Sequence, residues 1–133
     1  MTKFVVDSGV LIRLERDGVR VPASHRLFAP TLIRSQTLSA IYEAVHAGQM
    51  PRDEALERLG RIWAMPMRLL GDAVLRRRAF DIAEQQGWPD TYDAEYLALT
   101  QLQGEAFVTL DKALARRAKG IVPMATFEAL QKS

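Results

Sequence analysis

The chain has 133 residues, of which 48% are hydrophobic and 26% are charged, with 18 basic residues against 16 acidic ones. This composition predicts one globular domain over residues 1–133. The absence of cysteine excludes disulfides and thiolate metal sites and fits a cytoplasmic protein. A net charge of +2 does not by itself indicate a nucleic-acid partner, and we expect neither a signal sequence nor a membrane span, because every apolar stretch is short.

Apolar spacing predicts an alternation of strands and helices. In the first half these are a strand over 4–6, a helix with apolar positions 10, 11 and 14, a strand over 26–29, a helix over 31–48 and a helix over 51–63. The second half predicts a strand over 66–70, helices over 72–86 and 90–104, a strand over 106–109, a helix over 112–118, a strand over 121–124 and a helix over 126–131. Such alternation implies an α/β fold with a mostly parallel sheet covered on both faces.

Three aspartates could lie at the carboxyl ends of the predicted parallel strands, where functional residues of such sheets are usually found. Asp7 directly follows the first strand, Asp111 follows the strand over 106–109, and Asp93 lies near the start of a helix. Each alone is explained as a helix cap, with Asp90 and Asp93 in a capping-box-like arrangement. The carboxyl ends of parallel strands share one edge, however, so the three could converge there. Converging carboxylates repel one another unless a cation such as Mg²⁺ lies among them, and that ion would support phosphodiester hydrolysis.

Basic residues form two clusters that could contact RNA phosphates. The alternative is that these basic runs are ordinary solvent-exposed helix faces with no partner. The clusters therefore support the hydrolysis hypothesis without establishing it. The residues are Arg76, Arg77 and Arg78 in one cluster and Arg116, Arg117 and Lys119 in the other.

The segments FVVDSGVLI, APTLIRSQTLSAI and TYDAEYLALTQLQGEAFVTLDKALA, in this order, resemble a PIN-domain protein, and above all the small VapC-type toxins of prokaryotic toxin–antitoxin pairs. The resemblance covers essentially the whole chain. It implies a three-layer α/β/α PIN-like fold and an Mg²⁺- or Mn²⁺-dependent ribonuclease. Carried over residue by residue, it implies a site of Asp7, Asp93 and Asp111 supported by Ser8 and Thr109. It also implies an RNA substrate, a cognate antitoxin that blocks the acidic groove, and a homodimer.

One position departs from the family pattern, which has a fourth acid where this chain has Gln36. The amide oxygen can still bind a hard cation, but it lacks charge, so we expect weaker metal binding. Glu43 lies about 10.5 Å further along the helix at ~1.5 Å per residue, too far to replace it. The leading hypothesis is therefore a metal-dependent ribonuclease. The first alternative is a degenerate PIN domain that binds RNA or a protein partner without cutting, and the second is an unrelated α/β domain whose acids only cap helices.

Overall fold

The computed structural model describes residues 1–133 and contains four strands, six α-helices and one 3₁₀ helix. The strands are β1 (Thr2–Val6), β2 (His25–Pro30), β3 (Arg68–Leu70) and β4 (Ala106–Val108). The helices are α1 (Ser8–Arg16), α2 (Ile33–His46), α3 (Arg52–Trp63), α4 (Ala73–Gln86), α5 (Tyr92–Leu102) and α6 (Lys112–Ala118), followed by the 3₁₀ helix η1 (Phe127–Leu130).

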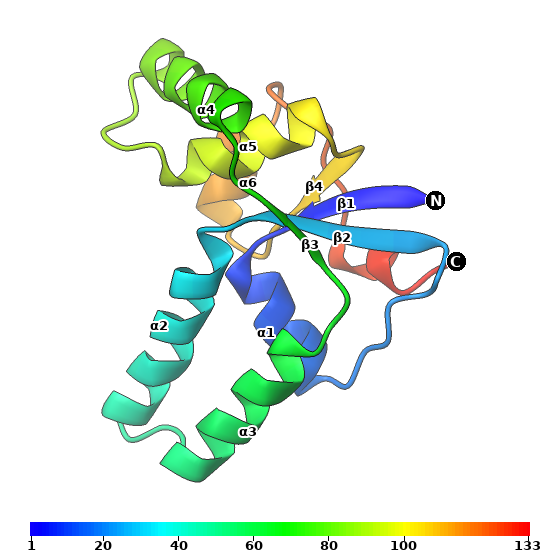
Figure 1. Ribbon diagram of the computed structural model, residues 1–133, viewed down its shortest axis with the longest axis vertical. Coiled ribbons are helices and arrows are strands. Elements are labelled where there is room, and N and C mark those ends of the chain that lie inside the picture. Colours follow the sequence, from blue (N-terminus) through cyan, green and yellow to red (C-terminus); the bar gives the residue numbers. More distant parts are fainter.

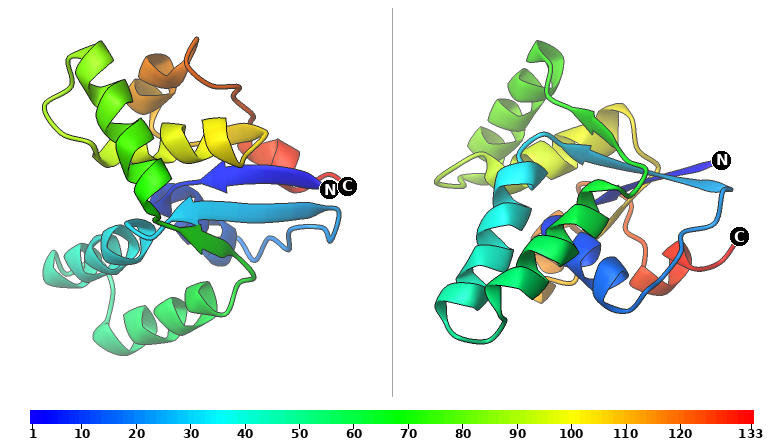
Figure 2. Two further views of the ribbon diagram at one scale, coloured as in Figure 1. Left: turned by 45° about the horizontal axis from the view of Figure 1, so that its top comes forward. Right: turned by 60° about the horizontal axis from the view of Figure 1, so that its bottom comes forward.

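The strands form one sheet in the order β3-β2-β1-β4, and every neighbouring pair is parallel. Val5 of β1 lies opposite Phe28 of β2 and Phe107 of β4, which fixes the register. Figures 1 and 2 show α1, α2 and α3 on one side of the sheet and α4 and α5 on the other. The sheet therefore lies between two helical layers, as the sequence predicted.

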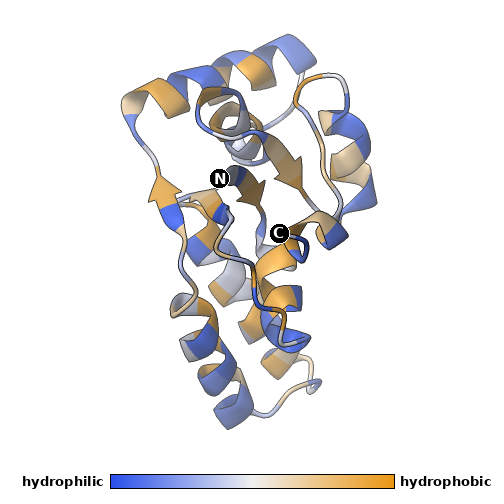
Figure 3. Cartoon of the chain, turned by 90° about the vertical axis from the view of Figure 1, so that its right-hand side faces the viewer, coloured by the Kyte–Doolittle hydropathy of each residue, from blue (hydrophilic) through white to orange (hydrophobic).

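The core is one cluster of 30 buried hydrophobic residues centred on the strands. In Figure 3 the strands are hydrophobic along most of their length, whereas the helices alternate hydrophobic and hydrophilic segments. This is the pattern of a parallel sheet buried on both faces. Val5 and Val6 are fully buried, so β1 carries the chain through the interior and delivers Asp7 at its end. None of the helices combines the length and the apolar character needed to cross a membrane.

One of the two C-terminal predictions was wrong, and the terminal helix is confirmed as a short 3₁₀ helix. The strand over 121–124 is absent, because only an isolated bridge joins Phe107 to Met124. Gly120, with φ of +89°, turns the chain just before this segment, and Pro123 has no amide hydrogen to donate to a ladder. The terminal helix is the 3₁₀ helix η1. The other predicted elements are present, with ends shifted by a few residues.

Candidate functional site

The carboxyl edge of the sheet places Asp7 beside the residues that follow β4. Asp7 ends β1 and caps α1, and its Oδ1 accepts a hydrogen bond from the Val10 amide at 3.1 Å. Its Oδ2 accepts a hydrogen bond from the Thr109 hydroxyl. Because β1 and β4 are neighbouring parallel strands, their ends bring residues 102 positions apart into direct contact.

Thr109 also links Asp7 to Asp111. The hydroxyl oxygen of Thr109 accepts a hydrogen bond from the Asp111 amide at 3.1 Å. Asp111 caps α6, with its Oδ1 accepting from the amides of Ala113 at 2.9 Å and Leu114 at 3.1 Å. Oδ2 of Asp111 makes no hydrogen bond within the protein, so one oxygen of this exposed carboxylate can bind another group.

Burial gives the Asp7 carboxyl group a raised pKa. The loss of solvent outweighs the lowering effect of the hydrogen bonds from Thr109 and Val10, and the negative charge of Asp111 raises the pKa further. No lysine or arginine forms an ion pair with Asp7. The ionised form of Asp7 is therefore disfavoured in the protein alone, and a cation at this edge would stabilise it.

Tyr96 is a site residue that the sequence prediction missed. Its hydroxyl donates a hydrogen bond of 2.5 Å to Oε1 of Gln36, which joins α5 to the first turns of α2. Burial raises the pKa of Tyr96, and the charges of Asp7, Glu95 and Asp93 raise it further, so the hydroxyl stays protonated and acts as a donor. Its position one turn after Asp93 was the available signal.

Asp93 lies in the first turn of α5, where it is paired with a cation from the chain itself. Arg117, in the last turn of α6, donates a hydrogen bond to Oδ2 of Asp93. The carbon of its guanidinium group lies 5.8 Å from the centre of the Trp88 ring. The side chains of Arg117 and Asp93 are 42% and 36% exposed, so this ion pair is open to solvent and can exchange.

The structure brings Asp7 and Asp111 together at one edge of the sheet but does not gather three acids around one metal position. No group of three His, Cys, Asp or Glu side chains is placed to hold a single metal ion. The Asp93 carboxylate is instead ion-paired with Arg117, and one oxygen of the Asp111 carboxylate caps α6. The oxygen donors nevertheless fit Mg²⁺ or Mn²⁺ in type, and the buried carboxylate of Asp7 has no cationic partner.

The remaining predicted residues lie on α1, α4 and α6. Ser8 is the first residue of α1, directly after Asp7. The arginines of α4 are held locally: Arg76 bonds the Gly71 carbonyl at 2.7 Å, Arg77 bonds Asp81 at 3.4 Å and Arg78 bonds Gln101 at 2.9 Å. Arg116 is exposed and has no carboxylate partner. Of the predicted basic residues, Arg117 is the one in direct contact with a candidate catalytic acid.

These features define an α/β protein with a three-layer PIN-like fold and an acidic carboxyl edge, as the sequence predicted. Solved structures share the fold. PAE2754 from Pyrobaculum aerophilum is 22% identical, with a TM-score of 0.76 over 98% of this chain and 93% of that chain. VapBC2 from Rickettsia felis is 8% identical, with a TM-score of 0.64 over 94% of this chain and 98% of that chain. Its crystal structure contains a DNA fragment from the VapBC2 promoter. At these identities the likeness is one of fold. No family model and no curated protein matches the chain.

Proposed function

We propose that this chain is a PIN-type endoribonuclease that depends on Mg²⁺ or Mn²⁺. The observation that carries the proposal is the network at the carboxyl edge, in which the Thr109 hydroxyl donates to the Asp7 carboxylate and accepts from the backbone amide of Asp111. Asp93 lies in the first turn of α5, three residues before Tyr96, and the charges of Asp93 and Asp7 both raise the pKa of the Tyr96 hydroxyl. Asp7, which is buried without a cationic partner, and Asp111 beside it would form, with Asp93 brought in from α5, a site suited to a hard divalent cation.

Each residue then has a distinct role. The bound ion would supply Lewis-acid activation of the phosphate and a nucleophilic water at neutral pH. Asp7 and Asp111 would hold the ion, joined by Asp93 once Arg117 has released it, and Gln36 would contribute a neutral, weaker oxygen. The Thr109 hydroxyl orients the Asp7 carboxylate. Arg117, freed from Asp93, would contact an RNA phosphate.

The proposed biological setting follows from the VapC-type resemblance. We propose that the enzyme is a cytoplasmic toxin, that it acts as a homodimer and that an antitoxin protein neutralises it. The VapBC2 structure supports this proposal because it shares the fold of this chain and because its name belongs to the VapC-type systems that the sequence resembles. Co-expression with a candidate antitoxin protein, followed by co-purification and loss of cleavage, tests this part of the proposal.

RNA cleavage tests the proposal most simply. The purified chain should cut single-stranded RNA with Mg²⁺ or Mn²⁺, and excess EDTA should abolish cutting. Asp93→Asn should reduce the rate by at least about 10–100-fold, the range for loss of groups that merely support metal ligands. Asp90→Asn, with the same change of charge three residues earlier, is the matched control and should cut normally. Equal cutting by wild type, EDTA-treated protein and Asp93→Asn would refute the proposal.

A second candidate function is a non-cutting PIN domain that binds RNA or a protein partner. Two observations favour it: Gln36 removes one negative charge, and Arg117 neutralises Asp93 from within the chain. The discriminating variant is Gln36→Glu. The non-cutting function would hold for this chain if the wild type cut no RNA at any metal concentration and the Gln36→Glu variant did.

A further inference from the structure

The side chain of Arg117 lies between a candidate metal ligand and an aromatic ring. Its guanidinium group donates to Oδ2 of Asp93, and the carbon of that group lies 5.8 Å from the centre of the Trp88 ring. Arg117 belongs to the last turn of α6, Asp93 to the first turn of α5, and Trp88 to the connection between α4 and α5. Of the seven ion pairs in the structure, this is the one that includes a candidate metal ligand.

The Arg117–Asp93 pair can open at low cost. Both side chains are partly exposed to solvent, and an exposed ion pair favours its closed form by no more than about fivefold. Trp88 gives the released guanidinium group a second partner, because a cation within about 6 Å of an aromatic ring is attracted to its face. Arg117 therefore has two positions near the site, one paired with Asp93 and one released from it.

The two partners of the pair face different ligands in the proposed function. Asp93 would bind a divalent ion, and that ion would repel the guanidinium group, because like charges at short range repel each other. Arg117 would bind an RNA phosphate, and a guanidinium group already bonded to a carboxylate has fewer N–H donors left for that phosphate. Each ligand therefore binds better when the pair is open.

We infer that the Arg117–Asp93 pair couples the binding of RNA to the binding of the metal ion. The ligand that arrives first opens the pair, and the second ligand then binds about two- to five-fold more tightly, a gain limited by the strength of the exposed pair. The coupling is reciprocal, so metal tightens RNA by the same factor as RNA tightens metal. This inference rests on the proposed function and describes a regulation of the same site.

Two other effects would also couple the ligands, and both are independent of Arg117. A phosphate oxygen of RNA could bind the ion directly, and the positive charge of the ion would attract RNA to the protein as a whole. Both effects persist when Arg117 is replaced by alanine. The contribution of the ion pair is therefore the ratio between the coupling factor of the wild type and that of Arg117→Ala.

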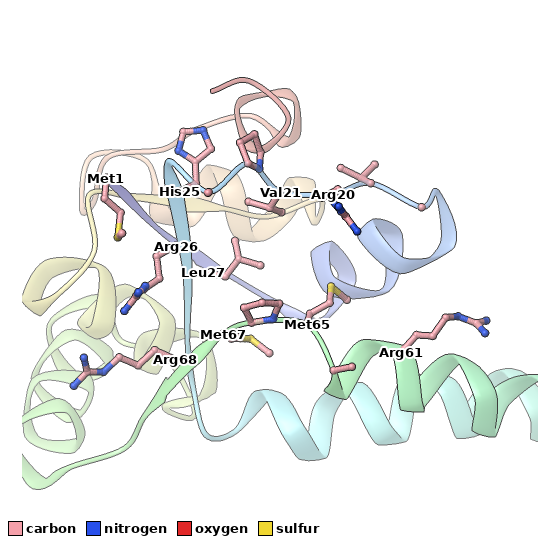
Figure 4. A pocket seen from close by; sticks show the side chains of 16 residues that line it. Met1, Arg20, Val21, His25, Arg26, Leu27, Arg61, Met65, Met67 and Arg68 are labelled. Atoms are coloured by element: carbon pink, nitrogen blue, oxygen red, sulfur yellow. The ribbon is translucent and has the colours of Figure 1, made fainter.

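A basic groove at the amino ends of the strands supplies a control for the general attraction of RNA. This groove has a volume of about 1140 Å³, and it is lined by four arginines and by no aspartate or glutamate. Figure 4 shows these residues, Arg20, Arg26, Arg61 and Arg68, around the strand ends. Because the groove shares no residue with the candidate site, Arg26→Ala removes a positive charge without touching the Arg117–Asp93 pair.

Calorimetric titration of the full chain with Mn²⁺, in the presence and absence of RNA, tests the inference. The RNA is a single-stranded oligouridine with phosphorothioate linkages, which keep their negative charge and resist cutting, and the heat of Mn²⁺ binding to this RNA alone is subtracted. The tightening of Mn²⁺ binding by RNA should be about two- to five-fold greater in the wild type than in Arg117→Ala. Arg116→Ala and Arg26→Ala should keep the coupling factor of the wild type, even where they weaken RNA binding itself.

Trp88 fluorescence gives a second readout, which reports the position of Arg117 directly. The chain has two tryptophans, so Trp63→Phe leaves Trp88 as the single emitter. Trp63 lies at the end of α3 and is partly exposed, which makes this change mild. Saturating Mg²⁺ should shift the Trp88 emission in Trp63→Phe, and the shift should be absent when Arg117→Ala is added.

The outcomes separate this inference from the proposed function. Equal coupling factors in the wild type and Arg117→Ala, with Mn²⁺ bound in both, would overturn the inference and leave the nuclease proposal intact. An equal loss of coupling in Arg26→Ala would overturn it in favour of general electrostatic attraction. Absence of Mn²⁺ binding with and without RNA would refute the proposed function and the inference together. If Arg117→Ala fails to fold, as judged by circular dichroism, Arg117→Gln takes its place with the same expected results.

Discussion

Asp7 serves as a helix cap and also has the properties of a metal ligand, but its burial favours the uncharged form, which a metal ligand cannot use. As a cap it needs only an oxygen acceptor for Val10, which an amide supplies as well. As a ligand it must be ionised, although burial raises its pKa and so disfavours the charged form. An unexplained cost of this kind at the end of a buried strand is typical of a functional residue.

Asp7→Asn should therefore stabilise the protein at neutral pH. A raised folded-state pKa means that Asp7 contributes stability below its unfolded pKa and loses that contribution as pH rises through the folded pKa. Urea unfolding at about pH 7 should show a higher midpoint for Asp7→Asn, and the gap should shrink as pH falls toward the carboxyl range near about 4. Asp72→Asn, an exposed cap of α4, is the control and should change little. A lower midpoint for Asp7→Asn at neutral pH would contradict this reasoning.

Gln36→Glu should tighten metal binding and weaken the metal-free fold. The new carboxylate keeps an acceptor for the Tyr96 hydroxyl but adds negative charge near Asp7 and Asp93. Calorimetric titration with Mn²⁺ should give a several-fold lower dissociation constant, and the melting temperature without metal should fall. Gln49→Glu adds the same charge at an exposed position and serves as the control. Unchanged affinity in Gln36→Glu would show that this position lies outside the site.

Arg117→Ala should also increase metal affinity, because Asp93 would no longer be engaged by an internal cation. Exposed ion pairs are worth at most about 1 kcal/mol, so the expected gain is about two- to five-fold. The shift of the melting temperature with increasing Mn²⁺ measures it. Arg116→Ala, which removes a neighbouring unpaired arginine, should leave the affinity unchanged. A weaker affinity in Arg117→Ala would instead make this arginine a supporting group of the site.

At the level of elements, the strand-to-helix junctions place Asp7 and Asp111. In α6, the capping role of Asp111 can be tested separately from its role in the site. Asp111→Ala removes the acceptor for two amides and should lower the free energy of unfolding by about 1 kcal/mol. Asp111→Asn keeps a capping oxygen and should be nearly as stable as the wild type. RNA cleavage should fall in both. Normal cleavage by Asp111→Asn would reduce Asp111 to a cap alone.

Some elements and site contacts could be predicted from the sequence, and others could not. β1 was predictable, because a buried apolar run ended on Asp7, and Asp111 followed a second such run. The hydrogen bond between Tyr96 and Gln36 was not predictable, since it depends on how α2 and α5 face each other across the edge. The Arg117–Asp93 pair escaped prediction for the same reason, and Arg117 was assigned to RNA alone. The single domain over residues 1–133 and the RNA-contacting arginines stay predictions.

At the scale of the whole molecule, the parallel sheet separates charge between its two edges. Asp7 and Asp111 lie at the carboxyl edge, and unpaired Arg26 and Arg68 lie near the amino edge. A net charge of +2 conceals this separation. The basic groove could not be predicted, because its lining combines segments distant in sequence.

The central claim is spatial: the carboxylates of Asp7, Asp93 and Asp111 share one divalent ion. An anomalous difference map from crystals grown with Mn²⁺ measures this directly. We expect one strong peak within ligand distance, roughly 2.1 Å, of oxygens from Asp7 and Asp111, with Asp93 released from Arg117. A map in which Mn²⁺ is absent from this edge at saturating concentration, or bound away from all three carboxylates, would contradict it.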